Sequence, residues 1–238
     1  SELDRKKNST VSKEKKATMS TPIVFVASKR FMGAWASPPK EFRNEQKLDV
    51  TSAGPKNSKN RVTFSPMEMK GYTDADEGTY PNYEAYWQSA KVIDGIDHTE
   101  RKKYWKSIKT PKRRDPKMNI IEKGKKIGTR SVLHAKHKRF SNQQINYVDS
   151  RKLIYVPDYF KYIKDEPHFL ELKRQVQAGK VFIVYDYDGP KNSDGDLACE
   201  RVTVEMLRQR IHDTSFPFGH GFVVAAALAG IPPEAYTI

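Results

Sequence analysis

Cysteine is almost missing from this chain of 238 residues, in which Cys199 is the only thiol. A single cysteine cannot close an intrachain disulfide, which excludes a disulfide-stapled secreted scaffold and fits a reducing compartment. Long apolar runs are missing too, because the most apolar stretch, residues 222–231, is only about half as long as a bilayer-spanning helix. The first residues are charged and include no apolar leader. We therefore expect no membrane partner and an intracellular location, in cytoplasm or nucleus, with a viral source left open.

Acidic residues are fewer than basic ones: the sequence has 29 Asp and Glu against 43 Lys and Arg, which gives a formal net charge of +14. The excess is concentrated in residues 100–139, here called the basic segment, which hold sixteen Lys and Arg against three acids. Such concentration favours a polyanionic partner, DNA or RNA, although solvated helix faces would also be basic. The candidate nucleic-acid-binding residues are Lys112, Arg113, Arg114, Lys125, Lys126 and Arg130.

Apolar residues are scarce in residues 1–20, a stretch rich in Lys, Ser, Thr and Glu. This composition cannot offset the entropy of ordering the chain, so the sequence predicts a disordered basic tail. The tail is either an arm that touches nucleic acid or a solubilising extension. Residues 21–238 have enough apolar content for a core, and we expect them to form one domain of the α+β class, mainly helical with a small β-sheet.

Regular elements can be placed along this domain from its periodicity. Apolar β-branched runs predict strands at 22–27 and 180–185. Gly, Pro, Ser and Asn punctuation within residues 41–69 predicts a hairpin of two edge strands, 47–51 and 61–64. Helices are expected at 100–108, 118–140, 169–178 and 200–212, and residues 154–163 are aromatic and amphipathic. The second of these would give the basic segment a broad basic helix face, interrupted near a glycine.

Residues 78–91, here called the motif segment, read Gly-Thr-Tyr-Pro-Asn-Tyr-Glu-Ala-Tyr-Trp-Gln-Ser-Ala-Lys. Pro81 cannot continue a preceding helix, and Asn82 is a favoured N-cap. No Gly or Pro follows before residue 93. The sequence therefore predicts a helix over residues 83–93 with one polar face and one apolar face.

The polar face of this helix carries Glu84, Gln88 and Lys91, which fall within roughly 60° of one another at about 100° per residue. A plain surface helix with supporting i,i+4 side chains meets this periodicity equally well. The pattern Gly-x-x-Pro-x-x-Glu-x-Tyr-x-Gln-x-x-Lys is more informative, because it resembles the signature helix of the NADAR family, the NAD- and ADP-ribose-associated proteins. The resemblance implies a NADAR-like fold and N-glycosidase chemistry on ribosylated nitrogen heterocycles, including riboflavin-pathway intermediates and ADP-ribosylated guanine.

On that resemblance, Glu84 acts as acid or base or orients the ribose, and Gln88 holds the base or sugar. Lys91 becomes a nucleophile toward C1′ if burial and neighbours lower its pKa. The loop at residues 31–35 resembles a relaxed version of the family's Phe-Ser-Asn-Phe loop, which walls the base and ribose pocket, although the Asn is absent. Trp35 would then stack on a substrate base, while a core tryptophan fits the pattern as well.

Two further stretches are candidate parts of the pocket. Asp186 and Asp188 follow a buried strand, where carboxylates suit ribose hydroxyls or acid/base work, and an Asp- and Gly-rich turn is the alternative. Gly219, His220 and Gly221 open a small-residue helix whose first N–H groups can approach an anion. NADAR proteins likewise end in a glycine-rich turn, with an Asn that is missing here. A close helix contact would explain the following alanines without any ligand.

No metal site and no cofactor are predicted. The acidic loop after residue 186 matches no EF-hand register, and residues 94–98 match no ligand template and read as a turn. His134 and His137 lie in a lysine-rich stretch where charge repulsion disfavours a metal ion. Both histidines are therefore predicted at the surface.

Two functions from different classes remain open. The first is an N-glycosidase that cleaves the ribose–base bond of a ribosylated or ADP-ribosylated nucleobase, within nucleic acid because a small substrate has no need of the basic segment. Its catalytic candidates are Glu84, Lys91 and Asp186, and its substrate-binding candidates are Trp35, Gln88, Asp188, Gly219, His220 and Gly221. The second is a non-catalytic nucleic-acid-binding or packaging protein that retains the fold. A concave pocket around Glu84 favours the enzyme, whereas a pocket filled by side chains favours the binder.

Overall fold

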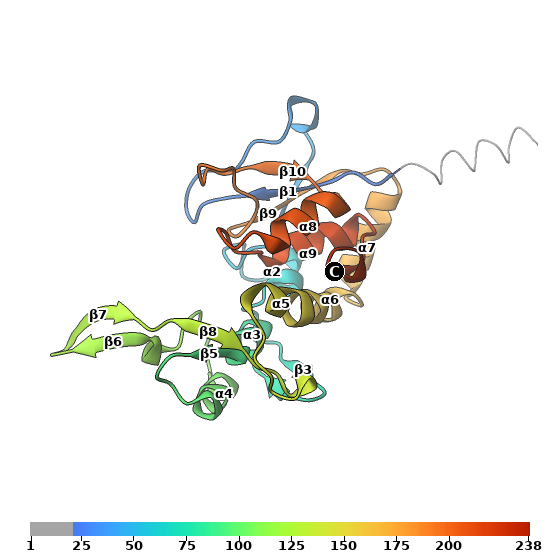
Figure 1. The fold of residues 1–238 in the computed structure, drawn as a ribbon. Coiled ribbons are helices and arrows are strands. Elements are labelled where there is room, and N and C mark those ends of the chain that lie inside the picture. Colours follow the sequence, from blue (N-terminus) through green and yellow to red (C-terminus); the bar gives the residue numbers. More distant parts are fainter. Residues whose placement is uncertain (1–20) are drawn as a thin grey trace, which may run out of the picture.

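The computed structural model describes residues 21–238, so the tail predicted at residues 1–20 lies outside the described residues. The protein is of the α+β class, mainly helical with small sheets, as the sequence predicts (Figure 1). In chain order its elements are β1 (Val24–Ser28), η1 (Lys40–Phe42), β2 (Gln46–Asp49), α2 (Lys59–Phe64), β3 (Tyr72–Asp74), β4 (Gly78–Tyr80), α3 (Tyr83–Ala90), β5 (Lys91–Ile93), α4 (His98–Ser107), η2 (Pro116–Met118), β6 (Asn119–Glu122), β7 (Lys125–Thr129), β8 (Val132–Ala135), η3 (Lys138–Phe140), α5 (Tyr147–Ser150), η4 (Arg151–Tyr155), α6 (Val156–Ile163), α7 (Pro167–Gln177), β9 (Phe182–Asp186), β10 (Cys199–Arg201), α8 (Val204–His212), α9 (His220–Leu228) and η5 (Pro233–Ala235).

A four-stranded sheet with the order β10-β1-β9-β2 organises the half of the molecule that contains both described chain ends. Strands β1 and β9, the two apolar runs expected from the sequence, pair in parallel. β2 is also parallel to β9, and β10 is antiparallel to β1. Because successive side chains alternate between faces, Val24 and Val26 enter the main core, while Phe25 and Ala27 enter a smaller one.

Helix α9 covers the main-core face of this sheet and contacts β1, β9, α6 and α7. Every residue of α9 is buried, which is the position expected for a helix that is apolar all round. The small side chains of Ala225, Ala226 and Ala227 let these neighbours approach closely. The alternative structural explanation for the alanines therefore holds.

The hairpin predicted within residues 41–69 is wrong. Its first strand exists as β2 but pairs with β9, far away in the sequence. Its second strand is the helix α2, because the Ser58 side chain accepts a hydrogen bond from the Arg61 N–H at 3.2 Å and caps the helix. Long-range pairing with a fully buried strand decided the structure here.

The helix predicted over residues 118–140 is also wrong. Strands β6 and β7 form a two-stranded ribbon that projects from the body of the molecule, and β8 returns to pair with β5 (Figure 1). Lys123 and Gly124, with φ of 50° and 76°, form the two-residue turn between the paired residues Glu122 and Lys125. Two positive φ values are typical of a type I′ turn, whose twist matches that of the strands it joins.

The other predicted helices are confirmed with shifted ends. α4 and α7 lie where expected, and Gly179, with φ of 101°, follows the end of α7. The amphipathic stretch at residues 154–163 forms the end of η4 and α6. α8 begins only at Val204, because the Thr203 side chain accepts a hydrogen bond from the Met206 N–H at 3.1 Å. The residues just before it form β10 instead. Within residues 21–238 no helix is long and apolar enough to cross a bilayer.

Candidate functional site

The polar face of α3 borders a cavity of about 530 Å³. Glu84, Gln88 and Lys91 line it, together with Asp188 and Gly219. A second hollow of about 170 Å³ shares Glu84 and Asp188 with the first. Residues predicted from three separate stretches of the sequence thus meet around one concave space, whose volume is typical of a small-molecule site.

Helix α3 starts as the motif segment predicts. The Asn82 side chain accepts a hydrogen bond from the Ala85 N–H at 2.8 Å. The helix ends at Ala90, three residues earlier than expected, and Lys91 begins β5. This early end has a visible cause, because the guanidinium of Arg101 donates to the main-chain oxygens of Gln88 at 2.8 Å and Lys91 at 3.1 Å.

The two faces of α3 divide as the sequence predicts. On the cavity side, the Gln88 amide donates to the Glu84 carboxylate at 2.8 Å, the i,i+4 contact expected from the spacing. On the opposite side Tyr83, Tyr86 and Ala90 are buried in the main core. The core therefore fixes the rotation of the helix, and the polar residues are held at the cavity wall.

The electrostatic environment gives two of these side chains unusual acidity. Burial lowers the pKa of the partly buried Lys91 amine, and Arg101 acts in the same direction, while the carboxylates of Glu84 and Asp188 oppose the shift. The pKa of Asp188 is raised, first by burial in the concave site and then by the neighbouring carboxylate of Asp186. Asp188 as a residue is exposed, and the raised pKa means that its carboxyl favours the protonated form more than an ordinary aspartate does.

Asp186 lines the second hollow but not the cavity that Lys91 lines, and its carboxylate accepts a hydrogen bond from the Gly221 N–H at 2.8 Å. The anion at the start of α9 is therefore this buried side chain rather than an external ligand. A Cβ on Gly221 would lie 2.6 Å from the Asp186 Cβ, and one on Gly219 would overlap the Asp186 carboxylate. His220 Nε2 donates to the Val50 carbonyl at 2.7 Å. The Gly219–Gly221 turn thus fits tightly around Asp186.

Three arginines of the basic segment reach the cavity, where Arg113, Arg114 and Arg130 form part of its wall. The loop that carries the first two is anchored by Asp115, which is buried 3.6 Å from the Arg101 guanidinium. The remaining candidate cations, Lys112, Lys125 and Lys126, are exposed and are not part of this wall. The six residues named together from the sequence therefore belong to two different surfaces.

The aromatic side chains at the cavity are ones that the sequence analysis did not single out. Trp87 of α3, Tyr147 of α5 and Tyr155 of η4 line it. Trp35, predicted to stack on a base, lines neither hollow; it packs edge-on against Tyr185, with ring centroids 4.7 Å apart, on the smaller-core side of the sheet. The position of Trp87 beside Gln88 in the motif segment was the available signal.

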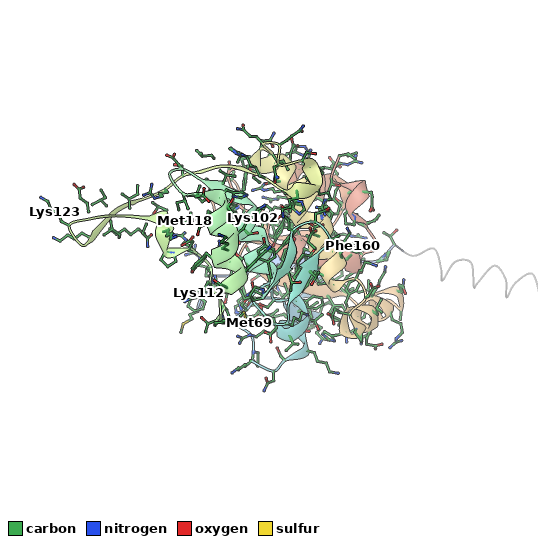
Figure 2. All side chains as sticks on the ribbon, turned by 90° about the horizontal axis from the view of Figure 1, so that it is seen from below. Met69, Lys102, Lys112, Met118, Lys123 and Phe160 are labelled. Atoms are coloured by element: carbon green, nitrogen blue, oxygen red, sulfur yellow. The ribbon has the colours of Figure 1, made fainter. Side chains whose placement is uncertain are left out.

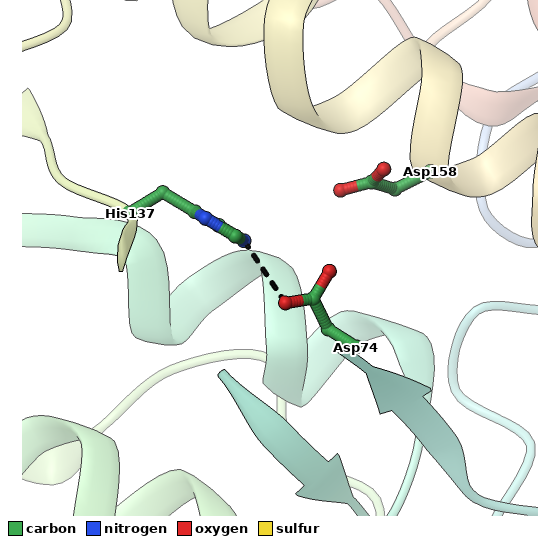
Figure 3. A group of neighbouring side chains, drawn as sticks. All are labelled: Asp74, His137 and Asp158. Atoms are coloured by element: carbon green, nitrogen blue, oxygen red, sulfur yellow. Dashed lines mark ion pairs between the residues drawn. The ribbon is translucent and has the colours of Figure 1, made fainter. Parts of the chain in front are cut away.

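Behind α3, a buried polar network joins this helix to α6. The Tyr86 hydroxyl lies 2.8 Å from His137 Nε2 and 2.5 Å from a carboxylate oxygen of Asp158. Figure 3 shows the His137 ring and the Asp74 carboxylate pointing toward each other. The Asp158 carboxylate points toward the same two side chains from α6. Arg139 completes the network, with its guanidinium 2.9 Å from Asp158. His137 is thus fully buried, and the prediction that it lies at the surface is wrong.

The three residues Asp74, His137 and Asp158 are close enough to hold a metal ion, but their environment does not fit one. His137 Nδ1 accepts a hydrogen bond from the Arg139 N–H at 3.0 Å, which places the proton of the neutral ring on Nε2. Burial and the adjacent Arg139 keep that ring neutral by lowering its pKa. Because Nε2 is a donor and Arg139 supplies the positive charge, the network is already satisfied without a metal.

Comparison with known proteins gives a family but no activity. No curated protein and no solved structure matches the chain significantly. A family profile matches residues 34–198, which include the motif segment, the basic segment and Asp188 but not the Gly219–Gly221 turn. Since the match spans more than half of the sequence, the chain belongs to the family of unknown function DUF6939.

Proposed function

We propose that this protein is an N-glycosidase that cleaves the bond between ribose C1′ and the base nitrogen of an ADP-ribosylated nucleobase. The observation that carries the proposal is the meeting of Glu84, Lys91 and Asp188 at one cavity, with a lowered pKa on the amine and a raised pKa on one carboxyl. Groups whose environments shift their pKa values in this way are typical of acid, base and nucleophile assignments. The NADAR-like motif segment is consistent with the same chemistry.

In the proposed reaction, the neutral Lys91 amine attacks C1′ and the C1′–N bond breaks, with its electron pair going to the base. The protonated Asp188 donates a proton to the departing base nitrogen. The C1′–O4′ bond then opens to give a Schiff base between Lys91 and the sugar, while the proton released by the amine goes to O4′. Water, activated by Glu84, hydrolyses the C=N bond and releases the sugar as its aldehyde, and the surplus proton on the Lys91 amine returns to the Asp188 carboxylate.

Substrate recognition in this proposal follows from the cavity wall. Arginine guanidinium groups bind phosphate oxygens in bidentate fashion, so Arg113, Arg114 and Arg130 suit the diphosphate of an ADP-ribosyl group. Trp87 and the exposed Tyr147 offer aromatic surface for the adenine or for the modified base. Asp186, hydrogen-bonded to Gly221, acts as a positioning residue that supports Asp188 rather than as the proton donor.

The alternative, a non-catalytic nucleic-acid-binding protein, is favoured by one specific observation. Much of the positive charge lies on exposed lysines outside the cavity, including Lys112, Lys125 and Lys126, where it has no role in bond cleavage. The concave space around Glu84, open rather than filled by side chains, favours the enzyme. We therefore place the glycosidase first.

The experiment that tests the proposal measures release of free ADP-ribose from an oligonucleotide carrying ADP-ribosylated guanine. We expect turnover by the wild type and losses on the order of 10³-fold in Lys91→Ala and 10²-fold or more in Asp188→Asn. Lys106→Ala, which removes an exposed lysine of α4, is the matched control and should keep full activity. Unchanged turnover in both Lys91→Ala and Glu84→Ala would exclude the mechanism. No turnover at all, with steep salt-dependent DNA binding, would support the non-catalytic alternative.

A further inference from the structure

The β6–β7 ribbon is the one long excursion from the body of the fold among the described residues (Figure 1). Figure 2 shows Met118 at its base and Lys123 at its far tip. The two strands pair only with each other, and most of their side chains are exposed. An isolated two-stranded hairpin is marginally stable in water, so the body of the protein gains little from it. The ribbon is therefore best explained by what it contacts outside this chain.

The surface of the ribbon is basic and apolar together. Lys123, Lys125 and Lys126 lie at the turn and on β7, against Glu122 as the single acid of the ribbon. Ile121 and Ile127 are 58% and 60% exposed. Ile121 lies directly opposite Lys126 in the strand register. This combination of cations and small apolar groups suits the phosphate backbone and the thymine methyl groups of DNA.

The shape of the ribbon selects one form of nucleic acid. The major groove of B-form DNA, about 12 Å wide, admits a two-stranded β-ribbon, whereas that of A-form RNA is too deep and narrow for side chains to read. Residues 119–129 contain no aromatic side chain, so the ribbon lacks the stacking surface on which single strands are bound. The geometry therefore favours a DNA duplex over RNA and over a single strand.

The base of the ribbon belongs to the candidate active site. Met118, Thr129 and Arg130 are part of the cavity wall, a few residues from the basic tip in the same hairpin. A duplex held by the ribbon would consequently lie next to the cavity, where a modified base turned out of the stack could enter. Two parts of the basic segment would then have different roles. Arg113, Arg114 and Arg130 would bind the ADP-ribosyl group, and the ribbon lysines would bind the DNA that carries it.

We propose that the β6–β7 ribbon is a DNA-binding element that enters the major groove of a duplex next to the cavity. This inference rests on the proposed function only in saying that the ribbon brings a modified base to the cavity. Binding of the ribbon to unmodified DNA requires no catalysis. It assigns the partner of the ribbon as B-form DNA.

The first test measures binding of the full chain to a fluorescently labelled duplex of unmodified DNA by anisotropy over a range of salt concentrations. The ribbon variant combines Lys123→Asn, which tolerates positive φ, with Lys125→Gln and Lys126→Gln. The control variant removes the same charge elsewhere, by Lys161→Gln, Lys173→Gln and Lys180→Gln in and after α6 and α7. Thermal unfolding of both variants should match the wild type, because the replaced side chains are exposed except for Lys173, which is only partly buried.

We expect the ribbon variant to bind on the order of 10²-fold more weakly near 0.1 M salt, with a slope of log affinity against log salt that is smaller by about 2 to 3. The control variant should bind like the wild type. Equal weakening in both variants would mean general electrostatics and would overturn the inference. Equal wild-type affinity for a single strand or for duplex RNA would overturn the groove assignment.

A second readout separates this inference from the proposed function. On ADP-ribosylated guanosine alone, the ribbon variant should turn over like the wild type, whereas on the modified duplex it should show a higher KM. Duplex binding that depends on the ribbon, in a protein without glycosidase activity, would refute the proposed function alone. Turnover of both substrates that is unaffected by the ribbon variant would refute the ribbon inference alone.

Discussion

The guanidinium of Arg101 lies 3.6 Å from the carboxylate of Asp115, and both side chains are almost completely buried. The same guanidinium donates to the main-chain oxygens of Gln88 and Lys91 at the end of α3. Through this pair, the loop carrying Arg113 and Arg114 is fixed to the residue that we propose as the nucleophile. Arg101 is a positioning residue that acts on both sides of the cavity.

Removing one member of this pair should be costly. Asp115→Ala leaves the Arg101 charge buried without its partner, and we expect the free energy of unfolding to fall by about 3 kcal/mol. Urea unfolding of the full chain measures it. The control is Lys103→Ala in the exposed pair with Glu100 on the same helix, for which we expect less than about 1 kcal/mol. Similar losses in the free energy of unfolding in the two variants would show that the buried pair contributes no more to stability than the exposed one.

A second prediction concerns the stability cost of Lys91. Burial lowers its pKa in the folded protein, so the folded state binds this proton less tightly than the unfolded chain. The resulting loss in the free energy of unfolding is fully present at pH values below the pKa of Lys91 in the folded protein. It disappears as the pH rises toward the ordinary lysine pKa of about 10.4. At pH 7, Lys91→Met should therefore abolish activity yet raise the free energy of unfolding by about 1 kcal/mol.

The matched variant for this prediction is Lys106→Met, whose lysine is exposed on α4. It should change the free energy of unfolding by no more than about 0.5 kcal/mol. Repeating both measurements at pH 7 and near pH 10 checks the sign. A gain for Lys91→Met that grows with pH would contradict the assigned direction of the pKa shift.

The network behind α3 gives a third prediction. Tyr86→Phe deprives the buried His137 and Asp158 of a hydrogen-bond partner, and we expect a loss of about 1–3 kcal/mol in the free energy of unfolding. Tyr236→Phe is the control, because the buried Tyr236 hydroxyl has no hydrogen-bond partner among the described residues. Its removal should be neutral or slightly stabilising. Equal effects would mean that the Tyr86 hydroxyl contributes nothing through its partners.

The fit of the Gly219–Gly221 turn around Asp186 gives a fourth. A Cβ on Gly221 would meet the Asp186 side chain at 2.6 Å, so Gly221→Ala must displace α9 or Asp186 and should cost at least about 2 kcal/mol. At Gly54, a Cβ would have only ordinary contacts, the nearest at 3.6 Å, and Gly54→Ala should be close to neutral. Thermal unfolding of the two variants decides. A neutral Gly221→Ala would contradict the assigned close approach.

These features differ in how far the sequence predicts them. The start of α3 follows from Asn82 and Pro81, and the division of its faces follows from helical spacing, because both are local properties. The turn at Lys123 and Gly124 was missed, since Lys-Gly is a weaker hairpin signal than Asn-Gly and its neighbours are spaced loosely like a helix. Local signals were sufficient only where no distant partner competed with them.

Distant contacts account for the remaining errors. Arg101 looks like any other cation of the basic segment, and only the folded chain brings it to Asp115 and the end of α3. His137 was predicted at the surface because its sequence neighbours are lysines, whereas its burial depends on Tyr86 and Asp158 from other elements. A side chain whose partners lie tens of residues away gives no local sign of its role.

The most direct test of the central claim is chemical trapping at Lys91. The protein is incubated with an ADP-ribosylated guanine oligonucleotide in the presence of borohydride, which reduces a Schiff base to a stable secondary amine, and the peptides are analysed by mass spectrometry. The account predicts a sugar adduct on Lys91 that is absent in Lys91→Arg and weaker in Asp188→Asn. Release of ADP-ribose with no adduct on Lys91, or with an adduct on another lysine, would contradict it.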